Sequence, residues 1–181
     1  SKTGARGTIH SEVIFDNAQV PAANLLGEVG RGFAQMMHSL DFVRLLTAAH
    51  ALGIAQAAYD EAVAYAKQRE TFGQPLHRHQ AIAFMVADMA TELHAARLIT
   101  HHAAAELDAG KTVGTQAAMA KLYASEAATR IAHKAQQIHG AWGVKRGSAV
   151  ERLYREARVT EIWDGTSEIQ RVVIGRSIFG R

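Results

Sequence analysis

Apolar residues recur at helical spacing along most of the chain. Between positions 33 and 69 there is no proline, and apolar side chains return every three or four residues, at Leu40, Val43, Leu52, Val63 and Ala66 among others. The same spacing continues through residues 80–109. Residues 115–138 are rich in alanine, which loses almost no side-chain entropy in a helix. With two shorter helices expected at 148–159 and 167–179, the pattern predicts a mainly α-helical protein.

Shorter segments with other patterns separate the predicted helices. Apolar and polar residues alternate over positions 9–15, which predicts one or two short strands. Residues 71–79 contain Gly73 and Pro75 and are expected to form a loop, and Gly140 suits a left-handed helix cap. Long alanine-lined helices joined by short loops favour a close-packed antiparallel bundle. The strands have too few partners for a sheet of their own, so we expect residues 1–27 to be the end of a β domain and its connector, and 28–181 to be a helical domain.

Composition and charge remove several classes of protein. The 181 residues include no cysteine, which excludes a disulfide scaffold, a cysteine zinc site and thiol catalysis. No window approaches the ~20 apolar residues that span a bilayer, so we expect no membrane span and a soluble, cytoplasmic protein. The formal net charge of +3 is a mild hint of affinity for phosphate-bearing partners.

The histidines and arginines are not spaced as metal or nucleic-acid ligands. His101 and His102 are adjacent, and adjacent helical residues point ~100° apart, so we expect no metal site. The basic stripe on residues 152–158 is interrupted by Glu151 and Glu156. This pattern fits a solvated or interface face better than a helix that reads DNA, and no nucleic-acid partner is expected.

Four groups of polar residues are not required by the packing of a bundle. They are Asp41 with Arg44, residues 69–73, residues 137–143 and residues 163–168. The last three lie at helix ends or loops, where free backbone N–H groups attract phosphate and carboxylate. Each group also has a purely structural interpretation. Asp41 and Arg44 are spaced as a surface ion pair, Thr166 as a helix cap, and Arg69 as a cation near a helix C-terminus.

Taken together and in this order, the motifs resemble the C-terminal half of the acyl-CoA dehydrogenase family. The resemblance rests on FDNAQVP at 15–21, RETFG at 69–73, REAR at 155–158 and IWDGTSEIQR at 162–171. Members are flavoenzymes with an N-terminal helical domain, a middle β domain and a C-terminal four-helix up-and-down bundle. The resemblance implies FAD at a subunit interface of a homotetramer or dimer, an acyl-CoA substrate, and an electron-transfer flavoprotein as acceptor.

Site residues follow from the resemblance position by position. Asp164 matches the catalytic base, which removes the proton α to the thioester while a hydride leaves the β carbon for the flavin. The backbone N–H of Asp164 matches the donor that stabilises the enolate-like charge. The matching substrate positions are Asp41, Val43, Arg44 and Gly165. The matching FAD positions are Arg69 and Thr71 at the diphosphate, Phe72 and Gln80 at the adenosine, Gln137, Gly140 and Ala141 from the partner chain, and Thr166 and Glu168 after the base.

The chain departs from the family pattern at Asp164 and at Ala141-Trp142; at the second place the family usually has glycine and a small polar residue. Asp164 stands where most members have glutamate, and its side chain is one methylene shorter, which matters because ~1 Å of misplacement can cost about 10²-fold in rate. Other members carry their base on the first bundle helix, but Val43 stands there, and Glu161 is a less suitable substitute. Trp142 is bulky beside an expected cofactor contact, and it either reshapes that edge or packs as a surface aromatic.

Two further functional classes remain open from the sequence. One is a flavin monooxygenase on the same fold, which would need no base at Asp164. The other is a non-catalytic bundle, either a base-defective subunit of a heteromeric dehydrogenase or a DNA-associated relative; Asp164 argues against the first form and the interrupted basic stripe against the second. In every case we expect these residues alone to be inactive, because the β domain that holds the flavin ring is absent from them.

Overall fold

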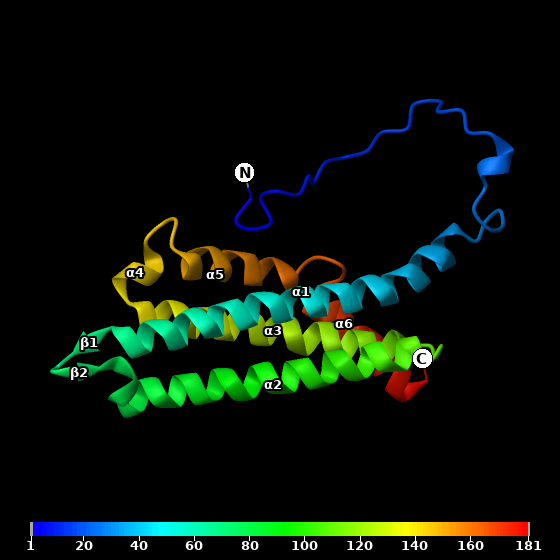
Figure 1. Cartoon of the computed structure of the whole chain (residues 1–181). Helices are drawn as coiled ribbons and strands as arrows, with labels where there is room; N and C mark the ends of the chain where they lie inside the picture. Colours follow the sequence, from blue (N-terminus) through cyan, green and yellow to red (C-terminus); the bar gives the residue numbers. More distant parts are fainter. Residues whose placement is uncertain (1, 181) are drawn as a thin grey trace.

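The computed structural model describes residues 2–180, in which long helices follow an extended N-terminal segment (Figure 1). The helices are α1 (Gly32–Gln68), α2 (Gln80–Asp108), α3 (Gly114–His139), α4 (Ala141–Val144), α5 (Ala149–Thr160) and α6 (Ser167–Phe179). Short 3₁₀ turns lie at Ala22–Asn24 and Leu76–Arg78. The five helices expected from the apolar spacing are confirmed with ends shifted by one residue at most, and α4 is an additional short helix.

Helix α3 is the centre of the bundle. It packs against α1, α2, α5 and α6, while α1 also contacts α2 and α5. Figure 1 shows α1, α2 and α3 lying side by side, with α5 along α1 and α3 on the other side from α2. The prediction of a mainly α-helical bundle is therefore confirmed.

Small side chains let the central helices approach closely. The core-facing alanines of α1 and α3 are almost completely buried, and they include Ala48, Ala51, Ala55, Ala58 and Ala62 on α1 and Ala117, Ala120, Ala124, Ala128 and Ala132 on α3. Larger apolar residues, such as Met89 on α2 and Ile131 on α3, fill the remaining space. This tight packing makes α1 and α3 stiff supports for the loops at their ends.

The strands predicted at residues 9–15 are absent, and that prediction is wrong for the described structure. This segment has no regular hydrogen-bond ladder, and its apolar residues are exposed, with Ile9 at 89% and Phe15 at 81%. A lone extended segment is not stable as a strand, because its backbone groups need a neighbouring strand. Closer to the N-terminus, residues 3–5 contact α5: the Ala5 amide donates to Glu156 at 2.7 Å, and Arg155 donates to the Thr3 carbonyl at 2.8 Å. The division at residue 27 stays a prediction.

Two tight connections sit at one end of the bundle. The expected loop between α1 and α2 contains a minimal hairpin, in which β1 (Glu70–Thr71) pairs with β2 (Gln74–Pro75). Between α3 and α4, Gly140 has φ 57° and ψ −132°. Its positive φ was expected, but its ψ lies outside the left-handed helical region, because the chain turns directly into α4 instead of closing an αL cap. The hairpin and α4 lie together in Figure 1.

Candidate active site

Asp164 lies in the loop that joins α5 to α6, and α1 holds its carboxylate. The hydroxyl of Thr47 on α1 donates to Oδ2 of Asp164 at 2.6 Å. Asp164 has φ +55° and the next residue, Gly165, has φ +96°. Left-handed backbone is uncommon outside glycine and asparagine, although aspartate tolerates it, so contacts around the loop must maintain this conformation.

Two buried polar side chains support the same loop. Gln170 on α6 is fully buried and donates to the carbonyls of Gly165 at 2.7 Å and Asp164 at 3.4 Å. Lys121 on α3 is also fully buried, and its Nζ donates to the carbonyl of Glu161 at 3.0 Å. Burial lowers the pKa of Lys121 to about 8, against an opposing attraction from Asp164 and other nearby carboxylates.

Asp41 and Arg44 form an ion pair on α1, with 2.6 Å between Nη1 and Oδ1. The interpretation as a surface pair is wrong, because the Arg44 side chain is only 4% exposed and that of Asp41 20%. Nε of Arg44 is buried without a partner within residues 2–180. Val43, between the two, is partly buried.

The start of α6 carries Thr166 and Glu168. The side chain of Thr166 accepts a hydrogen bond from the Ile169 amide, which confirms it as the helix cap. Glu168 is exposed in the first turn, and hydrogen bonds from its own amide and from Thr166 lower the pKa of its carboxyl. Glu161, the substitute base considered above, directs its carboxylate to Arg158 instead.

A second group of predicted residues gathers at the hairpin end of the bundle. Arg69, Thr71, Gly140 and Ala141 line one hollow of about 300 Å³, together with Trp142 and neighbouring side chains. Gln137 lies on an adjoining hollow that again includes Gly140 and Ala141. The structure thus brings together residues from two motifs that are separated by about 70 positions in the sequence.

The side chains at this end are available to a ligand. Phe72, at the hairpin tip, is 98% exposed, and Gln80 is exposed at the start of α2. The exposed Arg69 side chain forms no ion pair or hydrogen bond within residues 2–180. Trp142 is 55% exposed beneath Lys145, whose Nζ lies 4.4 Å from the ring centroid. An unpaired guanidinium, an exposed aromatic ring and a glycine open to close approach suit a phosphate-bearing aromatic cofactor.

The two groups are far apart within one chain. Thr47, which is bonded to Asp164, lies within α1, and Arg69, at the hollow, directly follows the last residue of that helix, about 33 Å away at 1.5 Å per residue. The predicted residues therefore fall into two groups. One comprises Asp41 and Arg44, which precede Thr47 on α1, and Asp164, Gly165, Thr166 and Glu168 in the α5–α6 loop and the start of α6. The other comprises Arg69, Thr71, Phe72, Gln80, Gln137, Gly140 and Ala141 at the hairpin end.

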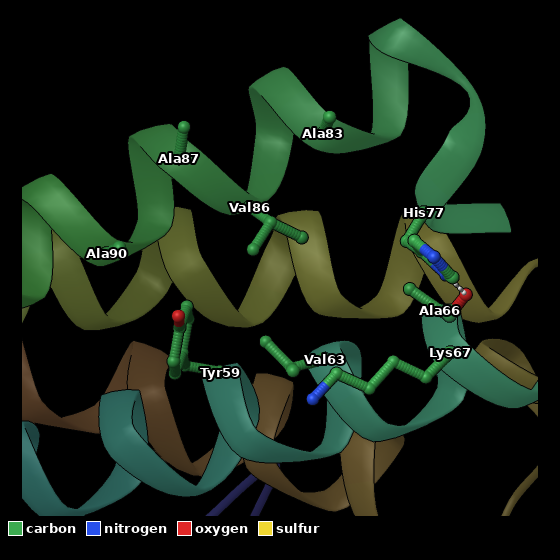
Figure 2. A pocket seen from close by; sticks show the side chains of 9 residues that line it. All are labelled: Tyr59, Val63, Ala66, Lys67, His77, Ala83, Val86, Ala87 and Ala90. Carbon is green, nitrogen blue, oxygen red and sulfur yellow. Dashed lines mark hydrogen bonds between the residues drawn. The ribbon is translucent and has the colours of Figure 1, made fainter.

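A third hollow lies between α1 and α2 and contains none of the predicted residues. It has a volume of about 370 Å³ and is lined mainly by apolar side chains such as Val63, Val86 and Ala90 (Figure 2). His77 at its end hydrogen-bonds the Ala66 carbonyl at 3.3 Å. Within the described residues, no group of three or more metal-ligating side chains is present, and no helix is long and apolar enough to cross a membrane.

Sequence reasoning missed three residues of the Asp164 site: Thr47, Lys121 and Gln170. A signal existed for two of them. Thr47 follows Arg44 by three positions, as Arg44 follows Asp41, so the three share one helical face. Lys121 interrupts the buried alanine stripe of α3, where a lysine is out of place unless a polar group meets it.

The chain is similar to known proteins over almost its whole length. Residues 30–179 match the family described as acyl-CoA dehydrogenase, C-terminal domain. The chain is 49% identical over 179 residues to an acyl-CoA dehydrogenase of Bacillus subtilis, covering 99% of this chain and 47% of that protein. It is 47% identical over 173 residues to subunit CarC of the caffeyl-CoA reductase–Etf complex of Acetobacterium woodii, covering 96% and 46%.

A solved structure shows the same fold. Butyryl-CoA dehydrogenase from Megasphaera elsdenii superposes with a TM-score of 0.97 at 42% identity, covering 99% of this chain and 47% of that one. The chain thus spans just under half the length of these relatives. The matched domain and the sequence identities show that the chain belongs to the acyl-CoA dehydrogenase family and corresponds to its C-terminal helical domain.

Proposed function

We propose that the chain is the C-terminal part of an enzyme that dehydrogenates an acyl-CoA thioester to the 2-enoyl-CoA, with Asp164 as the base. The observation that carries the proposal is the placement of Asp164: a partly buried carboxylate held by Thr47 in a loop fixed from three helices. A carboxylate on such a support can take a carbon-bound proton from a thioester, if the substrate lies within hydrogen-bond reach.

Asp164 supplies two groups to the reaction. Its Oδ1 has no hydrogen-bond partner within residues 2–180 and is free to receive the α proton. Its backbone N–H also has no partner within that part of the chain and can donate to the thioester oxygen as negative charge develops there. Bound FAD would supply the acceptor for the hydride that leaves the β carbon, so that the electron pair of the α C–H bond becomes the new double bond.

Substrate binding is assigned to Asp41, Val43, Arg44 and Gly165. Arg44 is buried with one nitrogen unpartnered, which suits a polar atom of the thioester's carrier, and Asp41 balances its charge. Gly165, beside the base, has a positive φ and a carbonyl held by Gln170. This backbone lets a ligand approach the main chain closely.

FAD binding is assigned to both groups of residues, acting in two different chains. Thr166 and Glu168 follow the base and would contact the cofactor that serves their own Asp164. The hairpin-end residues Arg69, Thr71, Phe72, Gln80, Gln137, Gly140 and Ala141 would contact the cofactor of a neighbouring subunit. The separation of about 33 Å along α1 supports this division, because one dinucleotide does not bridge it. The functional enzyme is then a homodimer or homotetramer.

An electron-transfer flavoprotein is proposed as the acceptor that reoxidises the enzyme. The support is the relative of Acetobacterium woodii, which is named as part of a complex with Etf. Its CoA-linked name also supports a thioester substrate.

The test is an anaerobic titration of the full-length enzyme with a panel of acyl-CoAs, followed by flavin absorbance. We expect one class of acyl-CoA to bleach the flavin in the wild type and in Asp108→Asn, which alters an exposed aspartate at the end of α2. Bleaching should be slowed by about 10³-fold or more in Asp164→Asn. Product formation that requires O₂ and survives Asp164→Asn would reject the proposal in favour of a monooxygenase, and a flavin that no acyl-CoA bleaches would reject a dehydrogenase.

A further inference from the structure

The hydroxyl of Thr47 is used differently from those of comparable helical residues. Ser39, Thr91, Thr100 and Thr129 each donate to the carbonyl four residues earlier in their own helix. This local bond is the usual choice for a hydroxyl within a helix. Thr47 instead donates across 117 positions of sequence to Asp164 at 2.6 Å, a short distance typical of a hydroxyl bound to a carboxylate.

The surroundings of Thr47 keep its hydroxyl in one place. Thr47 is 4% exposed, and Ala48 and Ala51, which follow it on α1, are fully buried. The branched threonine side chain has few rotamers in a helix. Thr47 is therefore a fixed donor on a long helix, whereas Asp164 sits in a loop whose backbone occupies the uncommon left-handed region.

We propose that Thr47 is a positioning residue for Asp164: its hydroxyl anchors Oδ2 so that Oδ1 is presented to the substrate. The inference rests on the proposed function, and it names the group that makes an aspartate effective at this position. Aspartate is one methylene shorter than the glutamate of most family members, so its reach must be set by its support. A base that is hydrogen-bonded to a neighbour on a rigid element spends less time in unproductive rotamers.

The first test is a kinetic double-mutant cycle in the full-length enzyme, using Thr47→Val, Asp164→Ala and the double variant. Valine keeps the shape of threonine and removes only the hydroxyl. We expect Thr47→Val to slow flavin bleaching at saturating acyl-CoA by about 10- to 100-fold, with less than about a threefold change in the half-saturating concentration. In the Asp164→Ala background the same substitution should change the rate less than about threefold, because the base it positions is gone.

Two further variants separate positioning from a general effect on the fold. Thr47→Ser retains the hydroxyl and should restore the rate to within about threefold of wild type, as expected when one hydrogen bond carries the effect. Thr100→Val removes a hydroxyl that is equally buried, at 4% exposed, but that bonds only its own helix. Its rate should remain that of the wild type.

A second measurement tests the contact between Thr47 and Asp164 without reference to activity. Urea unfolding of the wild type, Thr47→Val, Asp164→Ala and the double variant should show coupling between positions 47 and 164. Thr47→Val should raise the unfolding equilibrium constant about tenfold more when Asp164 is present than when it is alanine. Additive effects would overturn the contact. Coupling in unfolding combined with a wild-type bleaching rate in Thr47→Val would overturn the positioning role. If no acyl-CoA bleaches the wild-type flavin, the proposed function fails, and the unfolding cycle still decides whether Thr47 holds Asp164.

Discussion

Lys121 gives the sharpest prediction about stability, because it is a fully buried lysine inside an alanine-lined core. Its only hydrogen bond within residues 2–180 is to the Glu161 carbonyl, and burial lowers its pKa from 10.5 to about 8. Each pKa unit corresponds to about 1.4 kcal/mol, so keeping the charged lysine buried at pH 7 costs about 3 kcal/mol. The substitution Lys121→Met removes this charge while keeping a chain of similar length.

The direction of the pH effect follows from proton binding. Between pH 8 and 10.5 the folded protein has released the Lys121 proton while the unfolded chain still binds it, so stability increases with pH across this window. From pH 7 to pH 10 the wild type should gain about 2.5 kcal/mol relative to Lys121→Met. The hydrogen bond to Glu161 that methionine cannot make lowers the stability of the variant by an amount that is nearly constant with pH, so it does not alter this difference.

The measurement is urea unfolding of wild type, Lys121→Met and Lys67→Met, followed by circular dichroism at several pH values from 7 to 10. Lys67 is exposed near the end of α1, so its removal should leave the pH dependence parallel to that of the wild type. If the free energy of unfolding of Lys121→Met also changes with pH in parallel to that of the wild type, within about 0.5 kcal/mol, Lys121 does not titrate in this range. That result would refute burial as the dominant influence on this amine.

Two other predictions use the same unfolding assay. Gly53→Ala should stabilise the chain by about 0.5–1 kcal/mol, because Gly53 lies inside α1 with no atom within 4 Å of an added Cβ. Gly143→Ala should destabilise the chain by about 1–3 kcal/mol, because its Cβ would lie 2.2 Å from the Gln136 carbonyl oxygen. Equal effects of the two substitutions would contradict both predictions. Asp41→Ala should cost about 3 kcal/mol, since it leaves buried Arg44 unpaired. Glu92→Ala breaks pairs with Arg130 and Lys134, whose side chains are 46% and 24% exposed and can be hydrated, so it should cost below about 1 kcal/mol. A smaller loss for Asp41→Ala than for Glu92→Ala would show that Arg44 finds another partner or reaches water.

The helices could be predicted from the sequence because their signals are local. Apolar spacing, alanine content and turn residues fix where α1, α2 and α3 begin and end. Residues 9–15 carry an equally local strand signal, yet no strand forms there, because a strand needs a partner that local sequence does not supply. The same distinction explains why Gly140 was correctly expected to have a positive φ but not the ψ that leads into α4.

The candidate site, like the fold, could be predicted from the sequence only in part. The roles predicted for Asp164 and Arg69 came from the resemblance to the family, because on spacing alone Asp164 also fits a turn and Arg69 a cation near a helix C-terminus. Thr47 and Lys121 were not found: the face that Thr47 shares with Arg44 and the place of Lys121 in the alanine stripe mark both as unusual, but the sequence does not say which loop each supports. The contact from Thr47 to Asp164 exists only after α1 has packed beside the α5–α6 loop.

Helix α1 connects the two parts of the proposed site by its length. It carries Arg44 and Thr47 near the base, and it ends where Arg69 and the hairpin begin. Because each residue adds 1.5 Å and turns the helix by about 100°, a single insertion between Thr47 and Arg69 would swing the hairpin to another face of the bundle. The role proposed for the Arg69 motif in a neighbouring subunit therefore requires that α1 keep its register against α3. In this way the buried alanine stripe, which includes none of the residues proposed to bind the cofactor, sets the position of those residues at the hairpin end.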